Sequence, residues 1–441
     1  MRFITVNVLL LTLFVTTTFA GATIEFDVLS ELQGSLPGDP TGLGDQFGVF
    51  STIGGPNSVV VGAPLVSSGE FVDNGAAYFF SPSYGDWVQS QTPFTGVGSF
   101  DQVSELLATA RGDWLVVSCT GTPLFQNNPA YKDFSGAVCV FHREAGTWVL
   151  RQNITNPLGS VDGQFSFFGA NVNFDGQEWI VVGGLAVSNA WFYHLNCETN
   201  LFELSQTVTP PAIPVAPIGY VFVSISRDGI ALIGQPFVKG QSSNSATYVY
   251  TLNEHTGLWS NVQTLQGFNN PINPLFNTAD QFGEFTSING KWAVIGAPYD
   301  GQLGGVQGAA YVYRWQGQQY QNKQKLFSDQ PTTLFGFTVA VSGNLILVSD
   351  SPRIVNGKPF QGAVLAFQLM GNTWNQINVL TDPGGRAYDY FGAGGLDINA
   401  GMAIAGGCTF CYNYVPVNST IQPTFQFPLN NGRAVLYAEY D

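Results

Sequence analysis

Residues 280–313 read DQFGEFTSINGKWAVIGAPYDGQLGGVQGAAYVY, and residues 45–80 read DQFGVFSTIGGPNSVVVGAPLVSSGEFVDNGAAYFF. Both stretches open with Asp-Gln-Phe-Gly, continue through an apolar run that ends in Gly-Ala-Pro, and close with Gly-Ala-Ala-Tyr. A long pattern that recurs at two distant places in one chain indicates a structural repeat. The number and spacing of the copies therefore decide the fold.

Five weaker copies keep the same order of a Phe-Gly start, an apolar run, a Gly-rich loop and a small-then-aromatic strand. Aligned on the glycine of that start, the copies are marked by Gly48, Ser104, Gly169, Gly219, Gly283, Gly336 and Gly392. Their average spacing is about 57 residues, a period typical of propellers and solenoids.

Each copy holds four short runs that alternate in polarity or are rich in β-branched and aromatic residues, with Gly, Pro, Asn and Asp turns between them. Four such strands make one antiparallel blade. We therefore predict an all-β, seven-bladed β-propeller of four-stranded antiparallel blades. The fourth strand carries Trp87, Trp148, Trp259 or Trp374 in four copies, and these rings are expected to pack between blades. Trp191 and Trp315 fit this phase less well, so we expect them to be more exposed.

The last copy ends at its third run, because the chain stops at Asp441. Residues 23–32, TIEFDVLSEL, precede the first Phe-Gly and resemble fourth runs such as TWNQINVL. We expect this N-terminal strand to complete the last blade, which pairs both edges of the ring and removes the open strand edges that invite aggregation.

The order D-Q-F-G, V-V-G-A-P, G-A-A-Y-V-Y and a Trp strand resembles the FG-GAP repeat of integrin α-chains and of many secreted repeat proteins. This resemblance implies a seven-bladed propeller with a role in adhesion or ligand binding. Integrin-type copies also carry a calcium loop between the first two strands. The matching stretches here, IGGPNS, INGK and VSGN, lack the clustered carboxylates that Ca²⁺ requires. No cofactor is expected. Calcium remains an option only at loops other than these, because its usual loop motif is absent.

The chain opens MRFITVNVLLLTLFVTTTFA, with Arg2 ahead of an apolar run and small residues after it. This pattern predicts a signal peptide over residues 1–20, followed by a secreted, extracellular propeller over 21–441. Removing Arg2 leaves 14 basic and 30 acidic residues. Such a charge disfavours nucleic acid and anionic membrane surfaces, and no later segment is apolar enough for membrane insertion.

Five cysteines remain after the signal, and disulfides persist in an oxidising compartment. Cys408 and Cys411 form a Cys-x-x-Cys pair, for which a local disulfide is favoured over a zinc site because a second pair of ligands is missing. Asn153 and Asn418 lie in glycosylation sequons, so we expect a glycoprotein.

Catalytic patterns are weak. His142, His194 and His255 are the three histidines of the chain and no Gly-x-Ser-x-Gly elbow accompanies them, which disfavours a serine hydrolase. Acids such as Asp45 and Asp280 recur before successive Phe-Gly starts, as turn-forming residues do. The less regular acids Asp133, Asp300 and Asp350 are the candidates for an alternative function, that of a secreted carbohydrate-active enzyme.

Loop length points to one face of the predicted propeller. The connections between second and third strands are long, at residues 120–135, 235–245, 351–361 and 409–431, and they share a face with the connections between blades. Binding residues tend to lie on loops held by a rigid scaffold. The candidate ligand-binding side chains are Tyr131, Lys132, Arg353, Lys358, Phe410, Tyr412 and Tyr414. We predict a non-catalytic extracellular binding, adhesion or matrix protein whose partner is a protein or a glycan.

Overall fold

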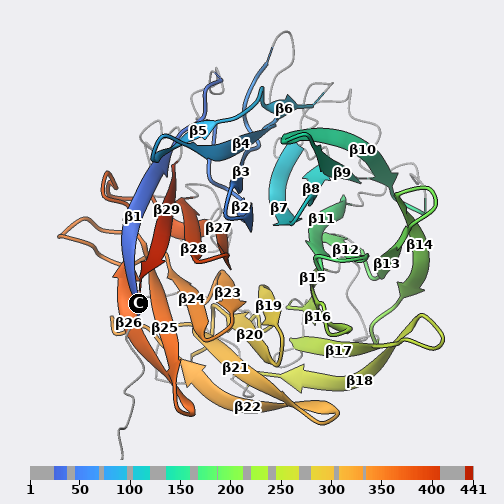
Figure 1. The fold of residues 1–441 in the computed structure, drawn as a ribbon. Helices are drawn as coiled ribbons and strands as arrows, with labels where there is room; N and C mark the ends of the chain where they lie inside the picture. The colour runs from blue at the N-terminus through green and yellow to red at the C-terminus, as the bar shows by residue number, and fades with distance from the viewer. Residues whose placement is uncertain are drawn as a thin grey trace, which may run out of the picture.

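The structure is a computed structural model in which strands form every regular element of the described residues (Figure 1). The residues described are 24–36, 45–68, 74–96, 103–119, 136–158, 167–185, 187–211, 220–236, 245–267, 280–301, 307–330, 334–407 and 433–440. The predicted signal peptide lies outside these ranges. Within them, no helix is long and apolar enough to cross a membrane.

The first half of the chain forms consecutive four-stranded antiparallel meanders. Their strands are β2 (Ser51–Gly55), β3 (Ser58–Ala63), β4 (Ala76–Ser83) and β5 (Asp86–Gln89), with the short β6 (Phe94–Thr95) beside β4; β7 (Val103–Arg111), β8 (Trp114–Cys119), β9 (Ala137–Glu144) and β10 (Thr147–Thr155); and β11 (Phe167–Phe174), β12 (Trp179–Leu185), β13 (Ala190–Asn196) and β14 (Leu201–Val208).

The second half repeats this arrangement. Its strands are β15 (Tyr220–Ser226), β16 (Ile230–Gln235), β17 (Ala246–Asn253) and β18 (Leu258–Gln266); β19 (Thr286–Asn289), β20 (Trp292–Ala297), β21 (Ala309–Gln316) and β22 (Gln319–Leu326); β23 (Val339–Ser342), β24 (Leu345–Asp350), β25 (Ala363–Met370) and β26 (Thr373–Leu380); and β27 (Phe391–Asn399), β28 (Met402–Gly407) and β29 (Ala434–Tyr440), joined by β1 (Glu25–Leu32). β12 also pairs with β15, which links two meanders into one eight-stranded sheet.

The sheets stand around a central opening, with the first strand of each meander innermost (Figure 1). Successive inner strands contact one another from β2 through β7, β11, β15, β19 and β23 to β27, and β27 contacts β2. The predicted all-β, propeller-like arrangement of four-stranded antiparallel sheets is therefore confirmed.

The Phe-Gly and Gly-Ala-Pro parts of the repeat join neighbouring sheets. Phe282 and Phe335 are fully buried. Gly336, which follows Phe335, has a φ of +85°, and a Cβ there would lie 2.3 Å from the Ala309 carbonyl oxygen of the preceding sheet. A Cβ on Gly296 would lie 2.1 Å from the Gly336 carbonyl oxygen. The repeat needs glycine at both places because only glycine allows two backbones to approach this closely.

The recurring acids before the Phe-Gly starts have the predicted turn-forming role at two positions. Asp45 Oδ1 accepts the backbone N–H of Phe47 at 3.1 Å, and Asp280 Oδ1 accepts that of Phe282 at 3.2 Å. Burial raises the pKa of each carboxyl to about 6, against the lowering effect of these hydrogen bonds. These two acids therefore serve the repeat itself.

Glutamine side chains connect the outer strands of neighbouring sheets. Gln263 Nε2 donates to the Tyr320 carbonyl at 2.9 Å, and the Tyr320 N–H donates to Gln263 Oε1 at 2.7 Å. The same double hydrogen bond occurs at five junctions, and we call these pairs the outer clasps: Gln91–Trp148, Gln152–Phe202, Gln206–Trp259, Gln263–Tyr320 and Gln324–Trp374. Each clasp satisfies a strand-edge N–H and C=O that the sheet leaves unpaired.

The N-terminal strand completes the last sheet, as predicted. β1 pairs antiparallel with β29 from Glu25, opposite Tyr440, to Leu32, opposite Ala434. Phe26 and Leu32 are buried at the positions where β10 buries Trp148 and Ile154. The two ends of the chain therefore share one sheet (Figure 1).

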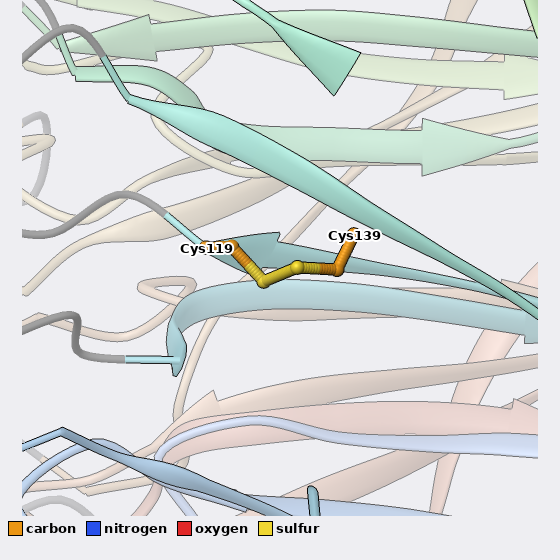
Figure 2. Close-up of a disulfide and its surroundings, with 2 residues drawn as sticks. All are labelled: Cys119 and Cys139. Carbon is orange, nitrogen blue, oxygen red and sulfur yellow. A yellow bond between two sulfur atoms is a disulfide. The ribbon is translucent and has the colours of Figure 1, made fainter. Parts of the chain in front are cut away.

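One disulfide occurs among the described cysteines, and the cysteine spacing did not predict it. Cys119, at the end of β8, bonds Cys139 of β9 (Figure 2), so it ties the base of the loop between these strands. Cys197 is a free, exposed thiol. The predicted Cys408–Cys411 pair lies outside the described residues.

The expected exposure of Trp191 is wrong, because this ring is completely buried in β13 and packs edge-on against Phe168. Trp87, Trp148, Trp259 and Trp374 are buried, as predicted.

Candidate functional site

A cavity of about 540 Å³ runs along the centre of the ring, lined by residues of all the inner strands. The inner strands begin at the Phe-Gly starts, on the side of the loops between second and third strands, and we call this side the long-loop face. They end at tight turns on the opposite side, which we call the turn face. The cavity differs in chemistry between these two ends.

Hydroxyl and amide side chains line the middle of the cavity and link neighbouring inner strands. Asn171 Oδ1 accepts the Val223 N–H at 2.7 Å, and Ser287 Oγ accepts the Val341 N–H at 3.0 Å. Further links are Thr52–Ala110, Asn173–Thr109, Asn173–Ile225, Ser224–Thr286, Thr338–Gly392 and Asn289–Gly343. Inner strands of adjacent sheets do not form a continuous ladder, so side chains satisfy their edge groups. Many of these polar groups are therefore already engaged within the protein.

A charged group closes the ring toward the turn face. Asp397 of β27 accepts a bidentate pair from Arg111, Nη1–Oδ2 at 2.9 Å and Nη2–Oδ1 at 3.1 Å. Asp397 Oδ2 also accepts the Thr52 hydroxyl and the Ile53 N–H, both at 2.9 Å. One carboxylate thus joins β27, β2 and β7, and its charge is balanced by Arg111.

Three phenylalanines form an aromatic arc toward the long-loop face. Phe222 and Phe285 lie with ring centroids 5.5 Å apart, and Phe285 and Phe337 lie 5.3 Å apart. All three are partly exposed and line the cavity. We call this end the cavity mouth; it offers aromatic surface where the other end offers paired charges.

Glu284 also lines the cavity and sits between Gly283 and Phe285, at the mouth. Its side chain keeps partial exposure, but its Oε2 atom is covered by protein and has no hydrogen-bond partner within the part of the chain that the structure describes. Burial raises the pKa of this carboxyl to about 8, because nothing nearby stabilises its charge. The equivalent residues Val49, Ala170, Phe337 and Ala393 are apolar, whereas Glu105, which follows Ser104 in the second copy, is also an acid.

The other acids of the cavity are placed differently. Asp175 Oδ1 accepts the backbone N–H groups of Gln177, Glu178 and Trp179, and burial nonetheless raises its pKa. Asp228 is exposed in a tight turn of the turn face. Among the side chains that the structure describes, the cavity therefore does not bring two unengaged carboxyls together at the mouth.

The candidate ligand-binding residues fall into two groups. Arg353 is buried, and its guanidinium pairs with Asp329 and with Asp350 Oδ2, the latter at 3.0 Å. This hydrogen-bonded pair lowers the pKa of Asp329. Lys358 is exposed on the long-loop face and donates to the Gly385 carbonyl at 2.6 Å. The remaining candidates lie outside the described residues: Tyr131, Lys132, Phe410, Tyr412 and Tyr414.

The candidate catalytic acids are engaged where the structure describes them. Asp300 is buried and binds Lys325 Nζ at 2.7 Å and the Tyr311 hydroxyl. Asp350 is buried against Arg353 and accepts the Ser328 hydroxyl at 2.6 Å. Asp133 lies outside the described residues. Both described acids thus hold loop bases together.

The sequon residue Asn153 is exposed on the outer strand β10, and Asn418 lies outside the described residues. No group of three or more His, Cys, Asp or Glu side chains in the described part of the chain could hold a metal ion. The three turns that match the calcium loops of integrin-type repeats, at residues 53–58, 288–291 and 341–344, contain no carboxylate, so these three positions do not fit calcium.

Sequence reasoning missed the cavity mouth. Glu284 and Phe285 belong to the repeat motif itself, and Phe222 lies in one of its weakest copies. A usable signal existed in Glu284, because an acid stands there where four other copies have an apolar residue.

The fold and the cavity together define a propeller-like all-β protein with a central cavity. Residues 276–313 match the family model described as "FG-GAP repeat", which confirms the resemblance found in the sequence. No curated protein matches the chain.

Two solved structures resemble the chain in fold. The crystal structure of RRP9 WD40 repeats has a TM-score of 0.51 at 11% identity, covering 96% of this chain and 98% of that one. A protein from Lactobacillus plantarum has a TM-score of 0.50 at 9% identity, covering 77% of this chain and 86% of that one. At such identities these likenesses concern the fold alone.

Proposed function

We propose that this chain is a secreted, non-catalytic, seven-bladed propeller that binds an extracellular protein or glycan at the cavity mouth. The seven blades are the four-strand meanders described above, with the eight-stranded sheet counted as two of them. The sheets, the FG-GAP repeat and the length in sequence of the connections between second and third strands support a binding scaffold.

The observation that carries the proposal is the mouth itself. Phe222, Phe285 and Phe337 remain partly exposed at the cavity, although two of them also pack against core residues. Glu284 Oε2 has no hydrogen-bond partner among the described residues. Ligand sites are concave, mainly apolar and aromatic, and carry few polar groups. An unsatisfied buried polar atom costs about 1–3 kcal/mol, so its retention favours a use in recognition.

Secretion is supported by the signal-like N-terminus and by the Cys119–Cys139 disulfide, because disulfides persist outside the reducing cytosol. The acidic balance of the chain disfavours nucleic acid as a partner. A purely structural matrix component would have no need for the unsatisfied Glu284.

The alternative of a carbohydrate-active enzyme has less support. Glycoside hydrolysis uses two carboxyls about 5–10 Å apart, one on each side of the scissile bond. Among the described candidates, Asp300 and Asp350 are engaged in buried ion pairs.

The test is binding of the full chain, produced through a secretory pathway, to arrays of glycans and extracellular proteins. We expect a specific hit that Phe222→Ala weakens about tenfold, because Phe222 belongs to the mouth and contacts only Phe285 among the described rings. Tyr84→Ala is the control, since Tyr84 is fully exposed far from the cavity in the β4–β5 turn. If Phe222→Ala does not weaken the binding, the binding site lies away from the mouth. Turnover of an arrayed glycan would overturn the non-catalytic role.

A further inference from the structure

A second group of aromatic side chains lies outside the cavity, on the long-loop face. Phe360 stacks on Tyr388 with centroids 5.4 Å apart and planes 21° apart, and its centroid lies 5.6 Å from that of Tyr390. We call Phe360, Tyr388 and Tyr390 the aromatic platform. Tyr390 packs against the small cluster of Val49 and Ala393, which lines the cavity mouth. The platform therefore borders the mouth.

Two of the three platform rings, Phe360 and Tyr388, lie outside the hydrophobic clusters of the described residues. Phe360 is 38% exposed, and Tyr388 and Tyr390 are partly exposed. By contrast, the phenylalanines of the Phe-Gly starts are fully buried. The two exposed rings that belong to no such cluster call for another explanation.

The backbone holds these rings in an unfavourable conformation. Phe360 has a φ of +53° and Tyr388 a φ of +68°, values that bulky residues rarely adopt. Tyr390, with φ of +48°, occupies the repeat position of Gln46 and Gln281, which share this φ. The positive φ at Tyr390 thus comes with the repeat. Glycine or asparagine in place of Phe360 or Tyr388 would relieve the strain there.

Backbone hydrogen bonds fix the two loops that carry the platform. The Tyr388 N–H donates to the Pro359 carbonyl at 3.0 Å, and the Tyr390 N–H donates to the Phe360 carbonyl at 3.0 Å. Lys358 Nζ adds a bond to the Gly385 carbonyl across the same two loops. The rings are therefore ordered before any ligand arrives, which lowers the entropic cost of binding.

We propose that the aromatic platform is a glycan subsite, on which the apolar face of a pyranose ring stacks while its hydroxyls meet the polar rim. This inference rests on the proposed binding function and narrows its ligand to a glycan. A sugar ring matches an aromatic ring in size and presents C–H groups on one face. Lys358 and Arg386 are exposed, each two residues along the chain from a platform ring, and both carry donors for sugar hydroxyls.

The size of the platform favours a sugar over a protein partner. A stable protein interface buries about 800 Å² on each partner. Three partly exposed rings offer a small fraction of that area, because a whole aromatic side chain buries about 150–250 Å². One sugar residue covers a surface of this size, and further residues of the chain can extend toward the cavity mouth.

The test uses variants that remove a ring and relieve the strain at once. Phe360→Asn and Tyr388→Asn keep a residue type that tolerates positive φ, so both variants should fold with unchanged or higher thermal stability. The matched control is Tyr84→Asn, which removes a fully exposed aromatic ring at a φ of +52° from a distant turn. Binding is measured by affinity electrophoresis in xylan, mannan and laminarin and by sedimentation with cellulose and chitin.

We expect the full chain to bind at least one of these polysaccharides, with about tenfold weaker binding for each platform variant and unchanged binding for Tyr84→Asn. Binding that persists in both platform variants would refute the platform while leaving a glycan-binding protein in place. If the unmodified chain binds none of the five polysaccharides, the glycan assignment is refuted. A protein hit that Phe222→Ala weakens would still leave the proposed function intact in that case.

Discussion

The outer clasps join five pairs of neighbouring sheets, whereas no described side chain makes such a clasp on either side of β1. A clasping glutamine stands four residues after the aromatic residue of each outer strand, as Gln263 stands after Trp259. At the two junctions beside β1 the same positions hold Asn378, after Trp374, and Ser30, after Phe26. Both side chains are shorter than glutamine, and neither spans to the next sheet.

The junction between β1 and β5 is held from the inside instead. Asp397 reaches from β27 to Thr52, Ile53 and Arg111 at the centre of the ring, where the other junctions use neutral hydroxyls and amides. Between β26 and β1, the Ile24 N–H donates to Gln368 Oε1 at 3.2 Å and the Tyr437 hydroxyl donates to the Thr381 carbonyl at 2.8 Å. The place where the ring closes thus depends on a charged inner link and on the pairing of β1.

The largest expected effect comes from deleting residues 24–32. The deletion exposes the edge of β29 and removes Ile24, Phe26 and Leu32 from the cores. Each buried side chain contributes about 1.5–3 kcal/mol, so their sum approaches the 5–15 kcal/mol that stabilises a typical domain. We expect loss of the cooperative thermal transition in circular dichroism. A chain that starts at residue 21 is the control, and equal transition temperatures for the two chains would contradict the closure.

Asp397→Ala should cost about 2–3 kcal/mol, because it leaves the Ile53 N–H and the Arg111 guanidinium without their acceptor. Arg111 is partly exposed, so water offsets part of the loss. Urea unfolding measures the change, with Asp86→Ala on the exposed part of β5 as the control, expected to change stability by less than about 0.5 kcal/mol. Equal effects of the two substitutions would mean that the inner link is dispensable.

Gln263→Ala should cost about 1–3 kcal/mol, since it leaves the buried backbone groups of Tyr320 without partners. Asn378→Ala is the corresponding substitution at the junction without a clasp. It should lower the free energy of unfolding by only about 0.5 kcal/mol, as is usual for a half-buried surface position. Urea midpoints at constant m-value compare the two. A loss for Asn378→Ala as large as that for Gln263→Ala would remove the distinction between the junctions.

Glu284→Gln should change how stability depends on pH. The folded-state pKa of about 8 lies above the ordinary value of 4.5, so the folded protein holds a proton that the unfolded chain releases between these values. Stability is therefore lost as the pH rises from about 4.5 to about 8, by at most about 1.4 kcal/mol per pH unit. Asp45 and Asp280 act in the same direction up to about pH 6.

Urea midpoints between pH 6.5 and 8 isolate Glu284 from those two acids. We expect the midpoint of the unmodified chain to fall across this range and that of Glu284→Gln to fall less. If the urea midpoints of the two proteins fall equally with pH, the Glu284 carboxyl is solvated at the cavity mouth. If a bound ligand removes the pH dependence of the urea midpoint in the unmodified chain, the ligand lies beside Glu284.

The fold could be predicted from the sequence because the same structural motif recurs in several copies of the repeat. Glycines such as Gly336 are needed wherever backbones of neighbouring sheets meet, and the tryptophans of the outer strands recur at one phase. Single residues were harder to place. Trp191 lies off that phase, which suggested exposure, but it faces Phe168 inside its own sheet. The Cys119–Cys139 bond escaped notice because 20 residues separate the two cysteines, and only the pairing of β8 with β9 brings them together.

The candidate sites were less predictable than the fold. Arg353 looked like a ligand-binding cation, yet its partner Asp329 lies 24 residues earlier in the chain and takes up its charge. The aromatic arc at the mouth joins Phe222, Phe285 and Phe337 from three different repeats. No local pattern marks such a set, because each phenylalanine alone is typical of a strand.

The sequence by itself determined the repeat, the four-strand plan of each copy and the completion of the last sheet by the N-terminus. These properties follow from local periodicity and from glycine at positions of close backbone approach. Only the tertiary structure decided which side chains meet at the centre and on the long-loop face. Ring closure brings Thr52 within hydrogen-bonding distance of Asp397, 345 residues away, and Phe360 against Tyr388 across two loops. Such contacts depend on how the sheets are arranged around the axis, which no short stretch of sequence encodes.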